Sequence, residues 1–126
     1  MSLTMKLLKD EYGVARLDVL DEVPKWVVKG EFYSITKTED ELSILCSEID
    51  IPSDVKCERN WRILKVEGPL DFSLVGILSS ISAVLAKVKI SIFVISTFDT
   101  DYILVKDKDL AKSIESLRNG GYNIIE

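Results

Sequence analysis

The chain has 126 residues, which is enough for one well-packed domain or for two very small ones that share a core. Its composition, 47% hydrophobic and 29% charged, is that of a globular protein, and its net charge is −5. A protein that binds nucleic acid needs a basic stripe that displaces counterions from phosphates, and no run of this sequence supplies one. Nucleic acid is therefore not an expected partner.

The absence of histidine removes the commonest general base near neutral pH and the commonest transition-metal ligand. Cys46 and Cys57 are spaced neither as a zinc motif nor as a redox motif, and two reduced thiols are typical of a cytoplasmic protein. No apolar stretch reaches the ~18 residues of a membrane span. We therefore expect a cytoplasmic protein with no metal site, no cofactor and no membrane partner.

The first half of the chain is predicted to be mostly sheet. Its opening strand runs through Arg16, and between Asp21 and Gly30 only the short segment 24–28 (PKWVV) can be helical. A sheet that is covered weakly on one face needs a partner, so we expect this half not to stand alone.

The second half begins with a strand and a long helix. Residues 61–67 (WRILKVE) alternate apolar with polar side chains, and Gly68-Pro69 ends this strand. Residues 71–88 carry apolar side chains at the i, i+3, i+4, i+7 spacing of a helix, with Asp71 as the expected N-cap.

The rest of the second half completes a known order of elements. Residues 90–97 are β-branched and apolar and predict a buried strand, and 102–105 predict another. Residues 107–118 place apolar side chains on one helical face before Asn119-Gly120-Gly121 ends the helix, and 122–125 form a last short strand. The order β-α-β-β-α-β is the ferredoxin-like plan.

The two halves repeat each other at an offset of 60 residues. Residues 34–46 (SITKTEDELSILC) match 94–106 (VISTFDTDYILVK) in apolar pattern and in the acidic loop, so that Glu41 corresponds to Asp101. A repeat of this length in so short a chain indicates two structural units.

The two predicted units are residues 1–60 and 61–126. The first is about 12 residues shorter between its opening strand and its acidic loop, which is about three turns of helix. We therefore expect the first unit to be a degenerate copy, mostly sheet, with a truncated first helix.

Three segments carry a family resemblance. GPLDFSLVGILSSIS (68–82), ISIFVISTFDTDYILVK (90–106) and FYSITKTEDELSILC (32–46) resemble the ACT domains of small bacterial tandem-ACT proteins. The same domain type occurs in CASTOR-type arginine sensors and in the regulatory end of aspartokinases. The resemblance implies an α+β fold of two ferredoxin-like (βαββαβ) ACT units that bind an amino acid or a similar small metabolite, regulate without catalytic residues, and associate as a homo-oligomer, with a dimer expected.

The resemblance also implies which residues face the ligand. The helix start offers unpaired amides to a ligand carboxylate, and the hairpin loop offers Asp101 or Asp99 to a ligand ammonium. The alternative interpretation involves no ligand. In that case the Asp and Thr residues of the loop only form a turn, and Asp71 only caps a helix. The implied ligand-binding residues are Gly68, Leu70, Asp71, Phe72, Ser73, Thr97, Phe98, Asp99, Thr100 and Asp101.

Three further expectations concern single features. Phe98 is expected to be a lid on the pocket or a contact between units, since exposing it has a hydrophobic cost. ACT domains usually have Ala-Gly before their second strand, so Lys89 must make that turn without a glycine's freedom. The far side of the long helix, with Ser79, Ser80 and Ala83, is expected to pack against a second unit or chain, or else to be a small solvated face.

Several functions remain open at this point. The first is an amino-acid sensor that acts through association of units or chains, and the second is an ACT dimerisation scaffold without a ligand. An enzyme of the acylphosphatase type needs an arginine in the loop after the first strand, and residues 66–70 contain none. An RNA-binding sheet needs exposed aromatics beside basic residues, and the strand 90–97 offers only Phe93.

Overall fold

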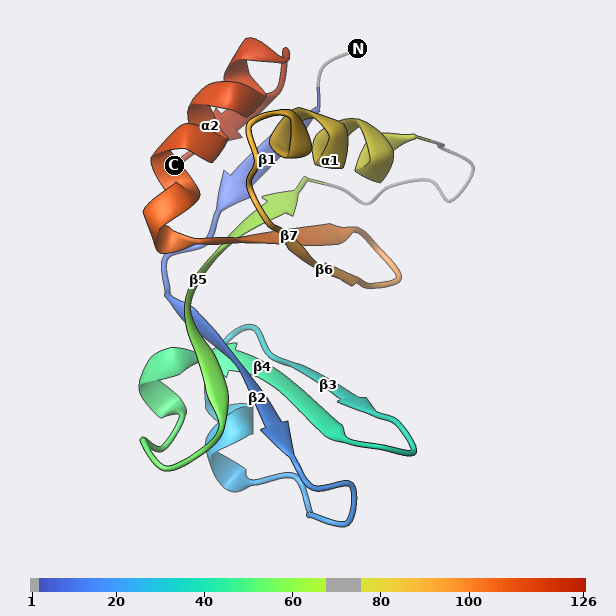
Figure 1. Ribbon diagram of the computed structural model, residues 1–126, viewed down its shortest axis with the longest axis vertical. Helices are drawn as coiled ribbons and strands as arrows, with labels where there is room; N and C mark the ends of the chain where they lie inside the picture. The colour runs from blue at the N-terminus through green and yellow to red at the C-terminus, as the bar shows by residue number, and fades with distance from the viewer. Residues whose placement is uncertain (1–2, 68–75) are drawn as a thin grey trace. The chain divides into compact units, whose positions relative to one another are not determined.

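The computed structural model describes residues 3–67 and 76–126, and its contacts divide the chain into two compact units (Figure 1). Residues 10–61 form the N-terminal unit, and residues 1–9 with 62–126 form the C-terminal unit. Among the described residues, no helix has the length and apolar character needed to cross a membrane.

The N-terminal unit is an antiparallel sheet with two short 3-10 helices. Its strands are ordered β3-β4-β2-β5, and only the first part of β5 belongs to this unit. The predicted short helix at residues 24–28 is confirmed as the 3-10 helix η1, so the first helix of this unit is truncated. The elements are β2 (Tyr12–Leu17), η1 (Lys25–Lys29), β3 (Ser34–Lys37), β4 (Leu42–Ser47), η2 (Glu48–Asp50) and β5 (Cys57–Val66).

The core of the N-terminal unit lies on one face of its sheet. Side chains alternate along a strand, so Ala15 of β2 and Ile44 of β4 point to the same face. There they pack against Val27 of η1 and against Ile51, which follows η2. The opposite face of the sheet therefore carries the alternate residues of the same strands.

From β5 onward, the C-terminal unit has the predicted β-α-β-β-α-β order, and β1 adds one strand before it. Its sheet order is β6-β7-β5-β1-β8, in which β1 pairs antiparallel with β5 and parallel with β8. These two pairings place the first strand of the chain in the C-terminal unit, whereas the predicted division gave it to the first. Besides β5, the elements are β1 (Thr4–Leu7), α1 (Ile77–Lys87), β6 (Phe93–Ser96), β7 (Asp101–Lys106), η3 (Asp107–Asp109), α2 (Leu110–Asn119) and β8 (Asn123–Ile125).

Both helices of the C-terminal unit cover one face of its sheet (Figure 1). Ile81 and Leu85 of α1 and Leu117 of α2 are fully buried, and they pack against sheet residues such as Met5 and Leu64. This spacing of buried residues on α1 is the one that the sequence predicts. Burying such a side chain contributes about 1.5–3 kcal/mol relative to leaving it exposed.

The two ends of helix α1 are set by residues with positive φ. It begins at Ile77, after Gly76 with φ 81°, and the predicted N-cap Asp71 lies outside the described residues. At its end, Lys89 adopts φ 62°, which confirms that this residue makes the left-handed turn without a glycine.

Candidate functional site

The predicted binding hairpin joins β6 to β7 through a turn closed by two threonines. The backbone N–H of Thr97 donates to the carbonyl oxygen of Thr100 at 2.8 Å, and the Thr97 hydroxyl donates to the same oxygen at 3.1 Å. The N–H of Thr100 in turn donates to Oγ1 of Thr97 at 3.3 Å. The turn is therefore fixed by its own residues, as Thr side chains often do.

Thr100 also ties this turn to the end of β5. It is only 4% exposed, and its hydroxyl donates to the carbonyl oxygen of Val66 at 2.6 Å. The structure thus places the hairpin turn next to the end of the strand that precedes the other predicted half of the site. The residues of that half, namely Gly68, Leu70, Asp71, Phe72 and Ser73, lie outside the described residues.

The two acids of the hairpin differ in their surroundings. Asp101 is partly buried, and its Oδ1 accepts a hydrogen bond of 2.5 Å from the hydroxyl of Ser96, which orients the carboxylate. Asp99 is exposed at the tip of the turn. Asp101 is therefore the better oriented of the two for holding a ligand ammonium.

Phe98 is largely exposed at the hairpin tip. Its side chain is 82% exposed, which is more than a lid or a contact between units predicts. Phe98 is exposed because of the turn. The hydrogen bonds between Thr97 and Thr100 place the two residues between them, Phe98 and Asp99, at its tip.

The N-terminal unit repeats this turn chemistry. The N–H of Thr38 donates to the carbonyl oxygen of Glu41 at 2.9 Å, and the N–H of Glu41 donates to Oγ1 of Thr38 at 3.1 Å. The structural equivalent of Glu41 is therefore Thr100 and not Asp101. The repeat is real, but its offset at the turn is 59 residues rather than the predicted 60, because the threonine at the start of the turn sets the register.

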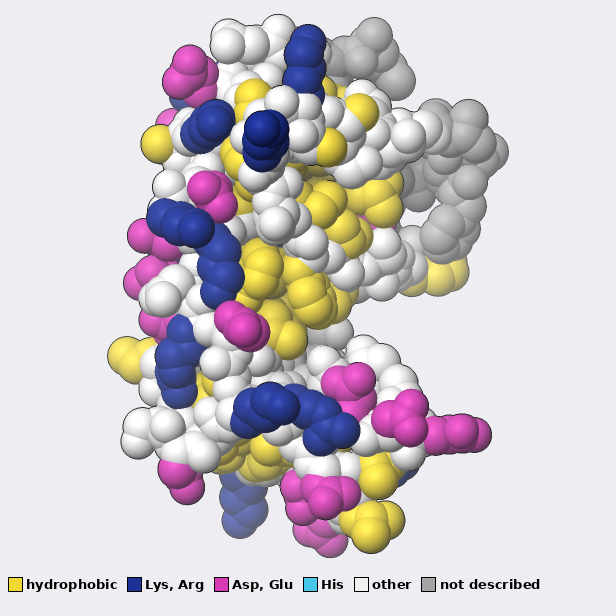
Figure 2. Space-filling view, viewed as in Figure 1, with side chains coloured by type: hydrophobic (Ala, Val, Ile, Leu, Met, Phe, Trp, Pro, Cys, Tyr) yellow, Lys and Arg dark blue, Asp and Glu magenta, His cyan; other side chains and the backbone are white. Residues whose placement is uncertain are grey.

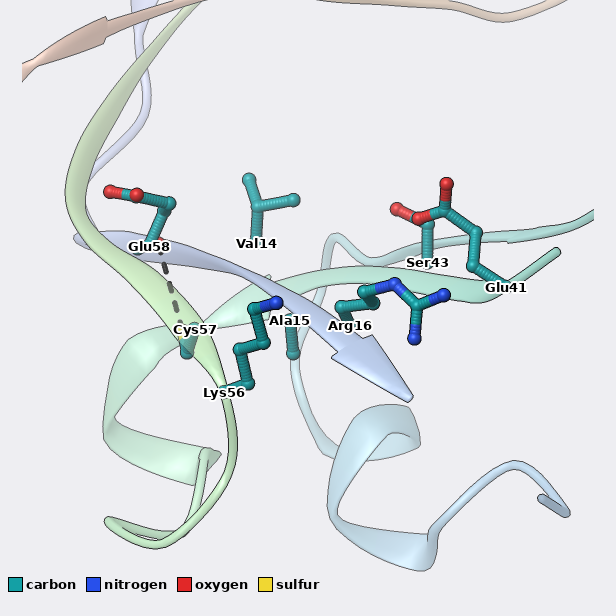
Figure 3. Close-up of a pocket in the computed structure, with 8 residues that line it drawn as sticks. All are labelled: Val14, Ala15, Arg16, Glu41, Ser43, Lys56, Cys57 and Glu58. Atoms are coloured by element: carbon teal, nitrogen blue, oxygen red, sulfur yellow. Dashed lines mark hydrogen bonds between the residues drawn. The ribbon is translucent and has the colours of Figure 1, made fainter. Parts of the chain in front are cut away.

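A cavity of about 220 Å³ lies in the N-terminal unit, and the sequence did not predict it (Figure 3). It involves three neighbouring strands, and Figure 2 shows basic side chains over this part of β2 with acidic ones beside them. Its polar side chains come from β2, β4 and β5 and from the residues directly before β4 and β5, and only the strand register brings these positions together. The lining residues are Val14, Ala15, Arg16, Glu41, Ser43, Lys56, Cys57 and Glu58.

The described residues of the two sites do not form a set of side chains suited to a metal ion. Among residues 3–67 and 76–126, no group of three or more Cys, Asp or Glu side chains is close enough to hold one. Cys46 is buried, and its burial raises the pKa of its thiol to about 11, with the nearby Asp50 adding to the effect. A thiol with so high a pKa is a poor nucleophile and a poor metal ligand at neutral pH.

Comparison with protein families confirms the resemblance. The sequence model of the ACT domain matches residues 56–119, and a model of an N-terminal domain matches residues 10–54. The chain belongs to the ACT domain family.

Curated relatives include the "cytosolic arginine sensor for mTORC1 subunit 1". The protein of that name from Mus musculus is 32% identical over 120 residues, which cover 81% of this chain and 36% of the relative. The Homo sapiens protein is 32% identical over 95 residues, which cover 69% of this chain and 29% of the relative. The chain therefore spans about a third of the length of these relatives.

Solved structures share the fold over almost the whole chain. Protein Atu0741 from Agrobacterium tumefaciens superposes with a TM-score of 0.93 at 41% identity, covering 99% of this chain and 93% of that one. Aspartate kinase from Clostridium acetobutylicum superposes with a TM-score of 0.65 at 14% identity, covering 93% of this chain and 33% of the kinase. The similarity to the aspartate kinase concerns the fold alone.

Proposed function

We propose that this chain is a regulatory ACT module that binds a free amino acid or a similar small metabolite. In this proposal the ligand lies between the hairpin turn at residues 97–101 and the segment 68–73. The ligand ammonium binds Asp101, and the ligand carboxylate binds backbone amides of the second segment. The module is not an enzyme, and it works in the cytoplasm.

The hydrogen bond from Thr100 to Val66 is the observation that supports this site most directly. It holds the hairpin turn against the end of β5, only two residues before the segment 68–73 begins. A short zwitterion can reach both segments only if they are close. The bond supports this by holding the hairpin turn at the end of β5, which precedes the second segment in the sequence.

The relatives support the ligand class. Proteins similar to this chain are named cytosolic arginine sensors, and the aspartate kinase that shares its fold is described as an allosteric enzyme. A ligand that binds one packing of ACT units more tightly than another shifts the population toward that packing. We therefore propose that the ligand acts on association between units or between chains, with a homodimer as the expected assembly.

Thermal unfolding in the presence of each standard amino acid tests this function. A ligand that binds the native state raises the Tm with its concentration. The wild type and Asp54→Asn, a control at an exposed acid outside the hairpin, are expected to show the same shift with one amino acid. Asp101→Asn is expected to reduce that shift, because the substitution removes the charge that binds the ammonium. A full shift in Asp101→Asn places the ligand elsewhere.

A dimerisation scaffold without a ligand is the second candidate function. It is favoured by Phe98, whose large apolar side chain is 82% exposed at the hairpin tip and is suited to contact with another chain. The scaffold would be supported over the sensor by two results. No amino acid would raise the Tm, and sedimentation would show a dimer that Phe98→Ser weakens.

A further inference from the structure

The cavity of the N-terminal unit lies where two basic residues occupy opposite positions on neighbouring chain segments. Val14 pairs with Glu58, Ala15 pairs with Cys57, and the N–H of Arg16 donates to the carbonyl oxygen of Lys56 at 3.0 Å. Arg16 therefore stands opposite Lys56. Like charges that stand directly opposite each other in a sheet destabilise it, so an anion placed between these two cations would be favourable.

The same face of the sheet carries the other polar residues of the cavity. Arg16 pairs with Ser43 on its other side. Lys56, which directly precedes β5, therefore forms one row with Arg16 of β2 and Ser43 of β4. Ala15 and Cys57 point away from this face, as Figure 3 shows, and contribute to the hydrophobic core. The row is thus on the face of the sheet opposite η1 and η2.

A hydrogen bond holds Arg16, the middle residue of the row, in place. The guanidinium of Arg16 donates to the carbonyl oxygen of Asp40 at 2.8 Å, which directs it toward the turn between β3 and β4. Glu41 closes that turn through Thr38 and brings its carboxylate to the same cavity. Within the described part of the chain, neither Arg16 nor Lys56 forms an ion pair.

We propose that this cavity is a second binding site, and that it takes a small zwitterion of the α-amino-acid type. The ligand carboxylate binds between Arg16 and Lys56, the ligand ammonium binds Glu41, and Val14 contacts the ligand's apolar part. The volume of about 220 Å³ is below the roughly 300–1,000 Å³ of pockets for drug-sized ligands, which favours a molecule of this size. This site does not depend on the one proposed at residues 97–101.

Nuclear magnetic resonance of the full chain, titrated with each standard amino acid, tests the second site. At least one amino acid is expected to shift the amide signals of Val14, Arg16 and Ser43 in a saturable way. Acetate and methylammonium each carry only half of the zwitterion, so they are expected to bind about tenfold more weakly or worse, because hydrogen bonds to charged groups are strong.

Charge-removing variants show whether the two cations bind the ligand. Lys56→Gln and Arg16→Gln are each expected to weaken binding at this site about tenfold. Lys25→Gln, which removes an exposed lysine outside the cavity, is the matched control and is expected to bind like the wild type. Because both cavity cations belong to an exposed sheet face, the fold is expected to survive, and unchanged amide signals elsewhere in the spectrum check this.

The outcomes separate the two proposed sites. Shifts at Val14 and Ser43 that disappear in Lys56→Gln but persist in Asp101→Asn support the second site independently of the first. No shift at these amides with any amino acid overturns the proposal, and so do shifts that Lys56→Gln and Arg16→Gln leave at full size. Acetate that binds as tightly as the amino acid also overturns it, because the cavity would then be a simple anion site.

Discussion

The side-chain hydroxyl of Thr100 donates a 2.6 Å hydrogen bond to the backbone carbonyl oxygen of Val66, from a position that is only 4% exposed. One threonine therefore both closes the β6–β7 turn and fastens this turn to the end of β5. The bond joins residues that are 34 positions apart, so it is a tertiary contact and not a local feature of the hairpin.

Thr100→Val should destabilise the C-terminal unit by about 1–3 kcal/mol. Valine has a similar shape but leaves the Val66 carbonyl without this donor in a buried place, and such a loss costs the desolvation energy of the group. Urea unfolding measures the change. Thr36→Val, at an exposed position of β3, is the control and should change the free energy of unfolding by no more than about 0.5 kcal/mol. Equal changes in the free energy of unfolding of the two variants would show that the bond from Thr100 to Val66 does not stabilise the protein.

Much of the fold could be predicted because its elements have strong periodicity. The buried positions Ile81 and Leu85 on α1 follow from helical spacing, and the β-α-β-β-α-β order follows from the alternation of strands and helices. The assignment of β1 to the C-terminal unit could not be predicted in this way. It depends on strand pairing between residues near opposite ends of the chain, such as Thr4 with Asn123.

The candidate sites were harder to predict because they depend on register. The apolar pattern and the acids of the sequence give the repeat an offset of 60, but the structure aligns it on Thr38 and Thr97, whose hydrogen bonds close the two turns. The cavity between Arg16 and Lys56 requires knowing which residues of two strands face each other. Hydrophobic periodicity fixes which face a residue occupies but does not fix its partner on the next strand.

Lys89→Gly should stabilise the protein by about 1 kcal/mol. Lys89 has φ 62°, and a residue with a Cβ atom pays about 1–2 kcal/mol in this conformation, whereas glycine does not. Lys87→Gly is the matched control, because it places the same substitution in the last turn of α1, where glycine costs about 1 kcal/mol. Urea unfolding should therefore give changes of opposite sign. Destabilisation by both variants would mean that Lys89 makes contacts that outweigh its backbone strain.

Gly13→Ala should destabilise the N-terminal unit by about 1–3 kcal/mol. A Cβ atom at Gly13 would lie 2.6 Å from Cδ1 of Ile51 and 2.8 Å from Sγ of Cys57, and overpacking of a core typically costs this much. Gly30→Ala is the control, since its nearest contact would be 3.4 Å from Oγ of Ser47. Thermal unfolding that shows the same Tm for the two variants would indicate that the core of this unit adjusts freely.

The free energy of unfolding should fall between pH 9 and pH 11 because of Cys46. Burial raises the pKa of its thiol from 9.0 to about 11, with the charges of Asp50 and Cys57 adding to the effect and Arg59 opposing it. Below pH 9 both the folded and the unfolded chain keep the proton, so the contribution of Cys46 is constant. Between the two pKa values only the unfolded chain loses the proton, and stability decreases by about 1.4 kcal/mol per pH unit.

A pair of cysteine variants isolates this effect from other alkaline titrations. Burial, with the charges of Asp10 and Glu31, also raises the pKa of Tyr12, from 10.0 to about 12, so part of the decrease above pH 10 belongs to that residue. Cys46→Ala should flatten the slope between pH 9 and 10, whereas Cys57→Ala should keep most of it, because the buried thiol remains. An unchanged slope in Cys46→Ala would assign the alkaline loss of stability to other groups, since a buried thiol is the one group removed by that substitution.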